Sequence, residues 1–565
     1  MSARPLDERQ SPITPAPAPA TRTSDLWWKN GVIYCLDVEK FVDGNGDGVG
    51  DFVGLTQKVD YLAGLGVTCL WLMPFYATPN QDDGYDVSDY YALDPRLGSF
   101  GDFVDFMRTA RDRGLRVITE LIVNHTSDEH PWFRAARDRG SPLHGFYVWQ
   151  DEKPEEEPAD IVFPDEESSV WAWDDEAGRW YLHRFYSFQP DLNVGNPLVR
   201  DEIRKIAGFW LQLGVDGFRV DAAPYLVDTT GLEGDPHADA LDWLRELCSY
   251  IQRRDGGSVM IGEVNLPPHE LRPYFGDDDG DGLHMLFNFN LNQALFLSLA
   301  RGECEPLDRA LDALPEIPER SQWVTFVRNH DELTLDKLDD HAREEVYRAF
   351  APDERMRLYG RGIRRRLPTM LDGDRARIEL AYSLLFTLPG TPALLWGEEI
   401  GLAEDLELED RLAVRVPMQW TEGPNGGFSA APVDQLVAPV RRDGQYGYER
   451  VNVASQRHDP DSLLNWMERM IRQRRECHEI GWGTPKRLKT GEGCVFVHRF
   501  DWEGRALLFA HNLAFEPKTV DLEVGIADVA RLDDLLSGER VEPEDGTLRL
   551  ELEPSGYRWF RVARD

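Results

Sequence analysis

The sequence has few of the features that would place a protein in a membrane or in an oxidising compartment. No apolar run reaches the roughly 18 residues that a transmembrane helix needs. The N-terminal segment lacks the charged and then apolar pattern of a secretory signal. The cysteines form no Cys-x-x-Cys pair and lie scattered along the chain, at Cys35, Cys69, Cys248, Cys304, Cys477 and Cys494. Scattered thiols without a signal sequence predict a reducing cytoplasm.

Basic residues are also in short supply. The 62 Lys and Arg residues stand against 101 Asp and Glu residues, which gives a formal net charge of −39. This charge disfavours nucleic acid and anionic membrane surfaces as partners, but it would not repel a neutral sugar. We find no phosphate-binding glycine loop, no catalytic set of Cys and His, and no nucleotide motif. Hydrophobic residues make up 42% of the chain, which is enough for a sizeable core.

Eight short apolar runs alternate with longer amphipathic stretches from about residue 30 onward. Runs of this length are typical of buried strands, and the segments between most of them have the periodicity of helices. The alternation predicts a parallel (β/α)8 barrel, an α/β fold of the TIM type. The runs are VIYCLDV from Val32, CLWLMPF near 70, RVITELIV near 117, GFRVDAA near 218, VMIGEV near 260, LFNFNL near 287, WVTFVRNHD near 324 and PALLWGEEIG near 393.

Shifts in composition divide the chain into five parts. Residues 1–26 are rich in Pro, Ala and Thr, which predicts a disordered tail. The barrel occupies 27–125 and 196–481, and it is interrupted at 126–195 by an acidic, Trp- and Tyr-rich stretch that we interpret as an inserted subdomain over the barrel mouth. Residues 482–565 contain only strand-like runs separated by turn signals, which predicts a C-terminal antiparallel β-sandwich.

Three of the predicted strands lead directly into a carboxylate. Asp221 ends GFRVD, Glu263 ends VMIGE and Asp331 ends FVRNHD. In a parallel barrel the carboxyl ends of all strands meet on one face, where the active sites of such folds lie. One of these acids alone would more often be a solvated loop residue or a helix cap. Three of them at strand ends on the same face predict an active site.

Retaining glycosidases work with two carboxylates on either side of the scissile bond. Asp221 suits the nucleophile, because Arg219 precedes it by two residues on the same strand face and a nearby cation keeps an acid ionised. Glu263 suits the general acid and base, because partial burial after an apolar run raises its pKa. We expect Asp331, next to His330, to bind sugar hydroxyls and to stabilise an oxocarbenium-like state.

These segments resemble the signature regions of the α-amylase superfamily, glycoside hydrolase family 13. The similar stretches are GFRVDAAP, IGEVN and VRNHDE at the fourth, fifth and seventh predicted strands, IVNH at Asn124 and His125, and QPDLN at 189–193. They occur in the expected order between Val32 and Trp420. The resemblance implies a barrel enzyme that acts on α-glucosides with retention of configuration.

Longer stretches resemble one group within this superfamily, the trehalose synthases, which are maltose–trehalose isomerases. Among these stretches are NGDGVGDFVGLTQKVDYLAGLGVT, ITELIVNHTSDEHPWF and RIELAYSLLFTLPGTP. The resemblance implies a pocket for the non-reducing glucose of a small α-glucoside such as maltose, trehalose or a short maltooligosaccharide. Its lining would consist of Asp82, Tyr85, His125, Arg219, His330 and Arg415.

Segments on the acceptor side of that pocket differ from the same group. GLEGDPHADA follows Asp221 in place of a longer insert with Asn, Cys and Glu, and VNLPP follows Glu263 in place of a segment with Gln and Trp. The first strand reads CLDVEKF and the sixth region reads FNFNLNQ. Three reactions therefore stay open: intramolecular transglucosylation between maltose and trehalose, hydrolysis by an α-glucosidase or small-maltooligosaccharide hydrolase, and glucosyl transfer to another acceptor.

A non-catalytic binding relative is the remaining alternative. Such relatives typically lose members of the carboxylate triad, whereas all three are present here. We therefore expect an enzyme without an organic cofactor, whose partner is a small α-glucoside. Assembly into a homo-oligomer is left open.

A Gly- and Asp-rich loop after the first strand predicts a structural calcium or magnesium ion. Its oxygen donors lie at alternate positions, as in calcium loops, with Gly48 at the sixth position and Gly54 where an EF-hand carries its bidentate Glu. The predicted ligands are the side chains of Asp43, Asn45, Asp47 and Asp51 and the backbone carbonyl of Val49.

The superfamily resemblance implies a second cation site beside the active site. The matching positions are Asn124, Asp191, Tyr225, Leu226 and Asp228. The acidic run at 277–281 could also bind a cation, but a solvated loop is the better interpretation.

Overall fold

The structure is a computed structural model that describes residues 26–155, 161–227, 240–522, 529–544 and 547–564. Residues 1–25 of the tail predicted at 1–26 and the predicted ligand Asp228 lie outside the described residues. No helix in the described part of the chain is long and apolar enough to cross a membrane.

Eight parallel strands form the closed barrel that the sequence predicts. Around the barrel they run in the order β1-β16-β12-β11-β10-β9-β5-β2, and every neighbouring pair is parallel. Their residues are almost all buried, which explains why the strands read as continuous apolar runs. The strands are β1 (Ile33–Leu36), β2 (Cys69–Leu72), β5 (Arg116–Leu121), β9 (Gly217–Val220), β10 (Val259–Gly262), β11 (Met285–Phe287), β12 (Gln322–Phe326) and β16 (Thr391–Leu395).

Helices surround the barrel, and their ends follow local sequence signals. The side chain of Asp51 caps α3, which ends at Gly66 in a left-handed conformation with a φ of 96°. Asn196 caps α6 in the same way, and Pro197 occupies its first turn. The longer helices are α3 (Phe52–Leu65), α4 (Phe100–Asp112), α6 (Pro197–Leu213), α8 (Ala240–Arg254), α10 (Phe289–Arg301), α11 (Glu305–Ala313), α12 (Asp340–Phe350), α14 (Arg375–Thr387) and α16 (Leu463–Glu476).

Shorter elements build the loops at the barrel mouth. Two strands, β3 (Tyr76–Ala77) and β4 (Asp89–Leu93), follow barrel strand β2, and the sheet β13-β15-β14 follows β12. The latter consists of β13 (Leu333–Thr334), β14 (Arg357–Leu358) and β15 (Gly362–Ile363). The short helices are α2 (Val38–Phe41), α5 (Pro131–Ala136), α7 (Ala223–Val227), α9 (Pro268–Leu271), α13 (Leu367–Met370), α15 (Val453–Arg457) and α17 (His478–Trp482).

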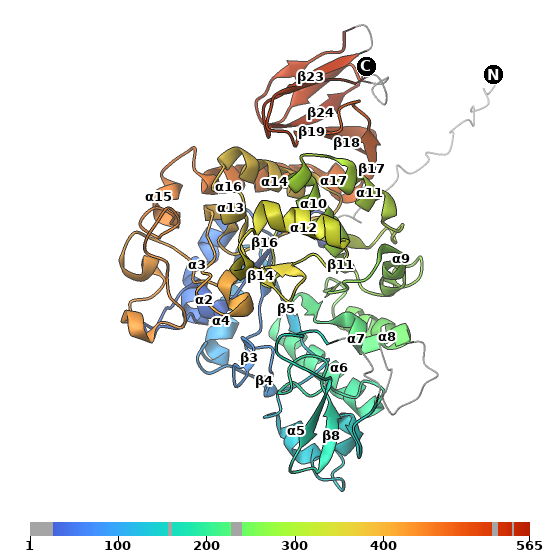
Figure 1. The fold of residues 1–565 in the computed structure, drawn as a ribbon, viewed down its shortest axis with the longest axis vertical. Coiled ribbons are helices and arrows are strands. Elements are labelled where there is room, and N and C mark those ends of the chain that lie inside the picture. Colours follow the sequence, from blue (N-terminus) through green and yellow to red (C-terminus); the bar gives the residue numbers. More distant parts are fainter. Residues whose placement is uncertain (1–25, 156–160, 228–239, 523–528, 545–546, 565) are drawn as a thin grey trace, which may run out of the picture.

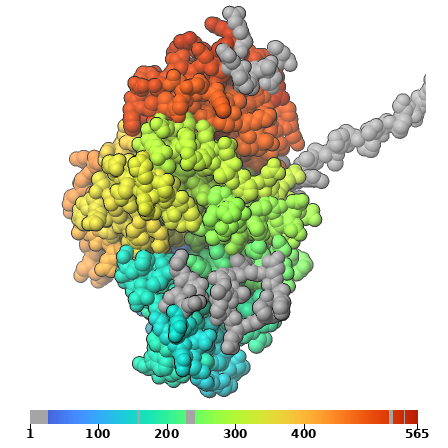
Figure 2. Space-filling view, turned by 45° about the vertical axis from the view of Figure 1, so that its right-hand side comes forward, coloured from blue at the N-terminus to red at the C-terminus, as the bar shows by residue number. Residues whose placement is uncertain are grey.

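The stretch between β5 and α6 forms a small antiparallel sheet of its own. Its order is β6-β8-β7, from β6 (Trp149–Gln150), β8 (Arg179–Leu182) and β7 (Trp171–Asp174). Val148, Val170, Trp171 and Leu182 form its own small core. This sheet and the C-terminal strands lie at opposite ends of the molecule (Figures 1 and 2).

The C-terminal region is antiparallel, as predicted. A six-stranded sheet has the order β17-β18-β19-β24-β21-β22, and β20 pairs with β23 in a second sheet. Along β18 and β19 side chains alternate, so that Val495 and Leu508 face the core of this region while Phe496 and Phe509 belong to the barrel core. The strands are β17 (Thr484–Leu488), β18 (Val495–Trp502), β19 (Arg505–Asn512), β20 (Lys518–Leu522), β21 (Arg531–Asp534), β22 (Arg540–Val541), β23 (Leu548–Leu552) and β24 (Tyr557–Ala563).

Candidate active site

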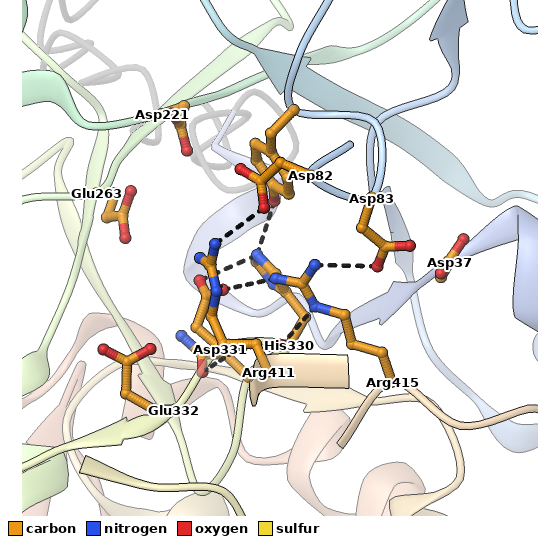
Figure 3. Close-up of polar contacts among 12 residues, drawn as sticks. Asp37, Asp82, Asp83, Asp221, Glu263, His330, Asp331, Glu332, Arg411 and Arg415 are labelled. Carbon is orange, nitrogen blue, oxygen red and sulfur yellow. Dashed lines mark hydrogen bonds and ion pairs between the residues drawn. The ribbon is translucent and has the colours of Figure 1, made fainter. Parts of the chain in front are cut away.

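The three predicted catalytic carboxylates lie together at the carboxyl end of the barrel (Figure 3). Asp221 directly follows β9, Glu263 directly follows β10, and Asp331 lies a few residues beyond β12. Because neighbouring parallel strands place their ends side by side, residues far apart in sequence meet here. A cavity of about 460 Å³ opens at this place, and Glu263 and Asp331 line it.

Arg219 on β9 connects two of these carboxylates. Its Nη1 donates to Asp221, and its Nη2 lies 2.8 Å from Oε2 of Glu263. Burial raises the pKa of Asp221, and the direct ion pair with Arg219 opposes that rise. Burial also raises the pKa of Glu263, to about 7, against the opposing effect of Arg219. Glu263 is therefore suited to carry a proton near neutral pH, as a general acid must.

Asp331 is held in the opposite state. Its Oδ2 lies 3.1 Å from Nε2 of His330, and its Oδ1 accepts from Arg411 at 3.0 Å and from Arg415 at 2.8 Å. Burial alone would raise the pKa of Asp331, but His330 and Arg411 hold it well below its ordinary value. Asp331 is therefore ionised in the folded protein at neutral pH, and its negative charge suits the stabilisation of a cationic transition state.

Arg411 is a site residue that the sequence analysis missed. It lies in the 3-10 helix η6 (Asp410–Val414), and its guanidinium bridges Asp331 and Asp82, each at 3.0 Å (Figure 3). Phe163 from the inserted segment lies against the same guanidinium, whose central carbon is 5.0 Å from the centre of the Phe163 ring. The nearest signal in the sequence is a second arginine four residues before Arg415 in EDRLAVRVPMQW.

Arg415 is buried, as are Arg219 and His330. It is 1% exposed, it donates to the carbonyl of His330, and it pairs with Asp83 as well as Asp331. Arg411 thus pairs with Asp82, whereas Arg415 pairs with Asp331 and Asp83.

The predicted aromatic and histidine residues form a continuous hydrogen-bonded layer. The hydroxyl of Tyr85 is 2.7 Å from Nε2 of His330, and the two rings stack with centroids 5.8 Å apart. His125 reaches the backbone carbonyl of Tyr85 at 3.2 Å. Burial lowers the pKa of His125 and lowers that of His330 to about 4, so both rings are neutral near pH 7.

Glu120 is a second residue that the sequence analysis missed. It lies on β5 with no exposed surface and accepts from Arg219 and from the indole of Trp71, each at 2.8 Å. Tyr85 donates to it at 3.3 Å. Burial, opposed by Arg219, raises the pKa of Glu120 to about 8. A charged residue inside the apolar run RVITELIV was the available signal.

The rest of the cavity is mixed in character. Its lining comes from the inserted segment, the loops after β9 and β10, and the segment after β12, and it includes Phe163, Tyr225, Asn265, Asp336, Lys337 and Arg361. Arg361 also donates to the carbonyl of Val162 at 2.7 Å, which ties the inserted segment to the segment after β12. Phe163 stacks on Tyr186 with centroids 4.4 Å apart.

The loop at 43–51 offers oxygen donors in the order that a hard cation prefers. Asp43 accepts from the backbone amides of Asn45, Gly46 and Gly48, and Asp51 accepts from Gly44 and Gly54. Gly46 and Gly48 have positive φ values of 86° and 100°, which fold the loop tightly. Within the described ranges, no group of three or more His, Cys, Asp and Glu side chains is gathered as metal ligands. The loop carries carboxylate, amide and carbonyl oxygens, which are the ligand types that a hard cation takes.

Among the residues predicted for a second cation, Asp191 forms an ion pair with an arginine. Oδ2 of Asp191 lies 2.8 Å from Arg184, both side chains are almost fully buried, and Asn124 donates to Oδ1 at 3.3 Å. The ring of Tyr225 lies 5.7 Å from the same guanidinium, and Leu226 is buried. An arginine already supplies the positive charge at this place, so these residues do not fit a second metal ion.

Comparison with known proteins agrees with this geometry. The chain matches the family described as "Alpha amylase, catalytic domain" over residues 35–349 and 363–483, and "Sucrose hydrolase-like, C-terminal domain" over 504–561. It is 42% identical to a trehalose synthase of Thermus thermophilus, over 95% of this chain and 56% of that protein. A trehalose synthase of Pimelobacter sp. (strain R48) is 40% identical, with 95% of this chain and 96% of the relative covered.

Solved structures give the same assignment. An α-amylase from H. orenii superposes with a TM-score of 0.77 at 27% identity, covering 95% of this chain and 100% of that one. The trehalulose synthase MutB from Pseudomonas mesoacidophila superposes with a TM-score of 0.75 at 25% identity, covering 95% of this chain and 99% of its own. The family match spans most of the chain, and the chain belongs to the α-amylase family, glycoside hydrolase family 13.

Proposed function

We propose that this enzyme interconverts maltose and trehalose through a covalent glucosyl–Asp221 intermediate. The observation that carries the proposal is the bridge that Arg411 makes between Asp82 and Asp331. A bridge across one end of the cavity supports a site that accepts a single terminal glucose, as a disaccharide-processing enzyme needs. The identity of 40% to the Pimelobacter trehalose synthase over nearly the whole of both chains supports the same reaction.

In the first step Asp221 attacks the anomeric carbon of the bound glucose. The bond between that carbon and the glycosidic oxygen breaks, and Glu263 gives its proton to the departing oxygen. Asp331 carries the negative charge that stabilises the oxocarbenium-like transition state, and Arg219 holds Asp221 and Glu263 in their places. The products are a glucosyl ester of Asp221 and a free glucose.

In the second step the ionised Glu263 removes a proton from a hydroxyl of the released glucose. The oxygen of that hydroxyl attacks the anomeric carbon and displaces Asp221. If the attacking hydroxyl belongs to the anomeric carbon of the acceptor, the product is trehalose. Water in place of glucose would give hydrolysis, so the outcome depends on how the acceptor side retains glucose and excludes water.

The contacts above the acceptor side support retention. Phe163 packs against Tyr186 and Tyr359, and Arg361 ties Val162 to the segment that carries Asp331. The inserted segment is therefore held to the segment after β12 by the contact between Phe163 and Tyr359 and by the hydrogen bond from Arg361.

Incubation of the purified protein with maltose, with products resolved by chromatography over time, tests this proposal. Trehalose with little free glucose is the expected result, and trehalose as the starting sugar should give maltose. Glucose as the main product would instead assign an α-glucosidase that hydrolyses its substrates.

We also propose a structural Ca²⁺ or Mg²⁺ held by Asp43, Asn45, Asp47, Asp51 and the carbonyl of Val49. A bound cation would fix the start of α3, because Asp51 is also the cap of that helix. It would also strengthen the contact with the loop at 428–437, which bonds to this loop through Ser429 and Asp43 at 2.5 Å. The ion would lie outside the reacting centre and supply no chemistry to it.

A reducing cytoplasmic setting is proposed on the basis of the cysteines. All six are free thiols, and all except Cys494 are buried. A buried free thiol is stable where disulfides do not form, and none of these cysteines contributes to the site described above.

A further inference from the structure

A buried lysine, Lys40, belongs to a chain of ion pairs that ends at Asp331. Its Nζ donates to Oδ2 of Asp37 at 2.9 Å and to Oδ1 of Asp83 at 2.6 Å. The other carboxylate oxygen of Asp83 accepts from Arg415 at 2.9 Å (Figure 3). Arg415 in turn donates to Asp331 at 2.8 Å. The sign of the charge alternates at every step from Asp37 to Asp331.

The first two members of this chain belong to CLDVEKF, one of the segments that differ from trehalose synthases. Asp37 directly follows β1 and caps α2, because its side chain accepts from the backbone amide of Glu39 at 2.9 Å. Lys40 lies on α2, and its backbone carbonyl accepts from the amide of Met418 at 2.9 Å. Met418 comes three residues after Arg415, so the backbone of Lys40 also contacts the segment that its side chain reaches through the ion pairs.

Lys40 and Asp83 are ionised although both side chains are almost completely buried, with exposures of 4% and 7%. Burial lowers the pKa of Lys40, but the charges of Asp37 and Asp83 outweigh it and raise the pKa above its ordinary value. Burial raises the pKa of Asp83, but Lys40 and Arg415 outweigh it and hold the pKa below its ordinary value. Lysine is almost never buried unless it is paired in this way.

Stability alone does not account for this arrangement. Apolar residues of similar volume in place of a buried ion pair often leave a fold equally stable or more stable. What the ion pairs do fix is geometry. Asp83 has a positive φ of 50°, and it lies in the turn between Asp82 and Tyr85, which closes with a backbone hydrogen bond of 2.9 Å. Both neighbours are predicted to line the pocket for the non-reducing glucose, so a fixed Asp83 carboxylate fixes the wall of that pocket.

We propose that Lys40 is a positioning residue for the glucose pocket. Through Asp83 it fixes the guanidinium of Arg415, and that guanidinium holds Asp331 in place. The inference rests on the proposed function, in which Asp331 stabilises the transition state. Lys40 is not among the described residues that line the cavity. Because it acts on the side of the donor glucose, its loss should slow glucosyl transfer without favouring water over glucose as the acceptor.

The test compares two substrates that place a glucose in the same pocket. Maltose and α-glucosyl fluoride both transfer a glucosyl group to Asp221, but only maltose releases a second glucose. Lys40→Met keeps the length of the side chain and removes its charge. We expect it to lower kcat/KM for both substrates by about tenfold, as for the loss of one charge-assisted hydrogen bond. The ratio of trehalose to glucose formed from maltose should stay within about twofold of wild type.

A double-mutant cycle with Asp83→Asn separates positioning from general support of the fold. Asparagine tolerates the positive φ and can still accept from Arg415, but it has no charge for Lys40 to neutralise. In the Asp83→Asn background, Lys40→Met should therefore lower kcat/KM for α-glucosyl fluoride by less than about threefold. An equal loss with and without the carboxylate overturns the proposal. If Lys40→Met does not fold, Lys40→Gln takes its place and is judged by the same criteria.

Lys29→Met is the matched control. Lys29 is also buried, with 7% exposure, and it precedes β1 whereas Lys40 follows it. It therefore lies at the end of the same strand that is remote from the active site, and its replacement should leave kcat/KM at the value of wild type. Unchanged kcat/KM in Lys40→Met overturns the proposal, as does an equal fall in Lys29→Met. A changed product ratio with unchanged kcat/KM for α-glucosyl fluoride overturns it too, because the effect would then lie on the acceptor side.

The products of wild type separate failure of this inference from failure of the proposed function. If wild type makes only glucose from maltose, the isomerase assignment fails. Hydrolysis passes through the same glucosyl–Asp221 intermediate, so kcat/KM for α-glucosyl fluoride still decides the role of Lys40. A tenfold fall in Lys40→Met that shrinks in the Asp83→Asn background supports that role for a hydrolase as well, and a fall of the same size in both backgrounds overturns it.

Discussion

Nη2 of Arg219 lies 2.8 Å from Oε2 of Glu263, so the residue proposed as general acid is in contact with a cation. Such a contact alone would lower the pKa of the carboxyl group. Burial is the stronger influence, and the pKa of Glu263 rises to about 7. Arg219 therefore limits the rise to a range in which Glu263 can both give and take a proton near neutral pH.

The rate of the first step should consequently fall on the alkaline side of pH 7. Glu263 must be protonated to donate, so full activity is expected below its pKa and a tenfold loss per pH unit above it. kcat/KM for maltose, measured from pH 5 to pH 9, gives this profile. α-Glucosyl fluoride, whose leaving group needs less help from an acid, should show a weaker alkaline decline. Identical alkaline limbs for the two substrates would remove Glu263 from the role of acid.

Replacement of Arg411 should lower kcat/KM for maltose more than replacement of an exposed arginine does. Arg411→Ala removes the bridge between Asp82 and Asp331 and leaves two buried carboxylates with fewer partners. Charge-assisted hydrogen bonds contribute roughly 1.5–3 kcal/mol each, so the loss of both should lower kcat/KM for maltose by at least about 100-fold. Arg411→Lys should recover only part of this loss, because an ammonium cannot reach both carboxylates as a guanidinium does.

Arg355→Ala provides the control for that measurement. Arg355 is 64% exposed and contacts Asp353 and Glu407 only at 3.6 and 3.7 Å. Its kcat/KM should equal that of wild type. If Arg411→Ala behaved in the same way, the bridge would have no part in substrate binding.

The barrel could be predicted from the sequence because its strands are buried on both faces. That burial makes each strand a short continuous apolar run, and eight runs in order determine the fold. The acids at the strand ends were equally visible, since Asp221 and Glu263 come directly after β9 and β10. Local patterns carry both kinds of information.

The pairing of charges across the site could not be predicted in the same way. Arg411 meets Asp82 across 329 residues of chain, and Glu120 meets Arg219 across 99. Nothing in the local sequence of Arg411 identifies its partner, and only the folded barrel brings the two together. The local sequence likewise does not reveal that Arg184 pairs with Asp191 at the predicted second metal site. There a buried guanidinium takes the place of a metal ion.

Calcium should stabilise the protein through the loop at 43–51. Asp47→Asn is the informative change, because an Asn oxygen can still accept from the amide of Val49 while one negative charge is lost. We expect Ca²⁺ to raise the Tm of wild type from which metal has been removed with a chelator. The free energy of unfolding should increase by RT ln(1 + [Ca²⁺]/Kd). The rise should be much smaller in Asp47→Asn at the same Ca²⁺ concentration. Differential scanning calorimetry measures the shift in Tm that Ca²⁺ causes in each protein. Equal shifts in both would rule out this loop as the binding site.

Acid should destabilise the contact between the barrel and the C-terminal sheet. His498 on β18 and His511 on β19 stack at this contact with centroids 5.8 Å apart, and they reach Thr387 and Ser383 on α14 at 2.9 Å. Burial lowers the pKa of His498 to about 3, whereas an unfolded histidine titrates near 6.5.

Because the folded state resists protonation of His498, the unfolded state binds more protons between these two pKa values. The stability is thus complete above pH 6.5 and is lost progressively as the pH falls below it, by about 1.4 kcal/mol per pH unit for one histidine. His498→Gln keeps a donor for the carbonyl of Thr387 but cannot titrate. Between pH 6 and pH 4 we expect the free energy of unfolding, measured in urea, to decline less steeply in this variant than in wild type. The slopes should differ by about 1.4 kcal/mol per pH unit. His269→Ala, at an exposed position, should follow wild type. Parallel curves for His498→Gln and wild type would show that protonation of His498 does not limit the acid stability of the contact.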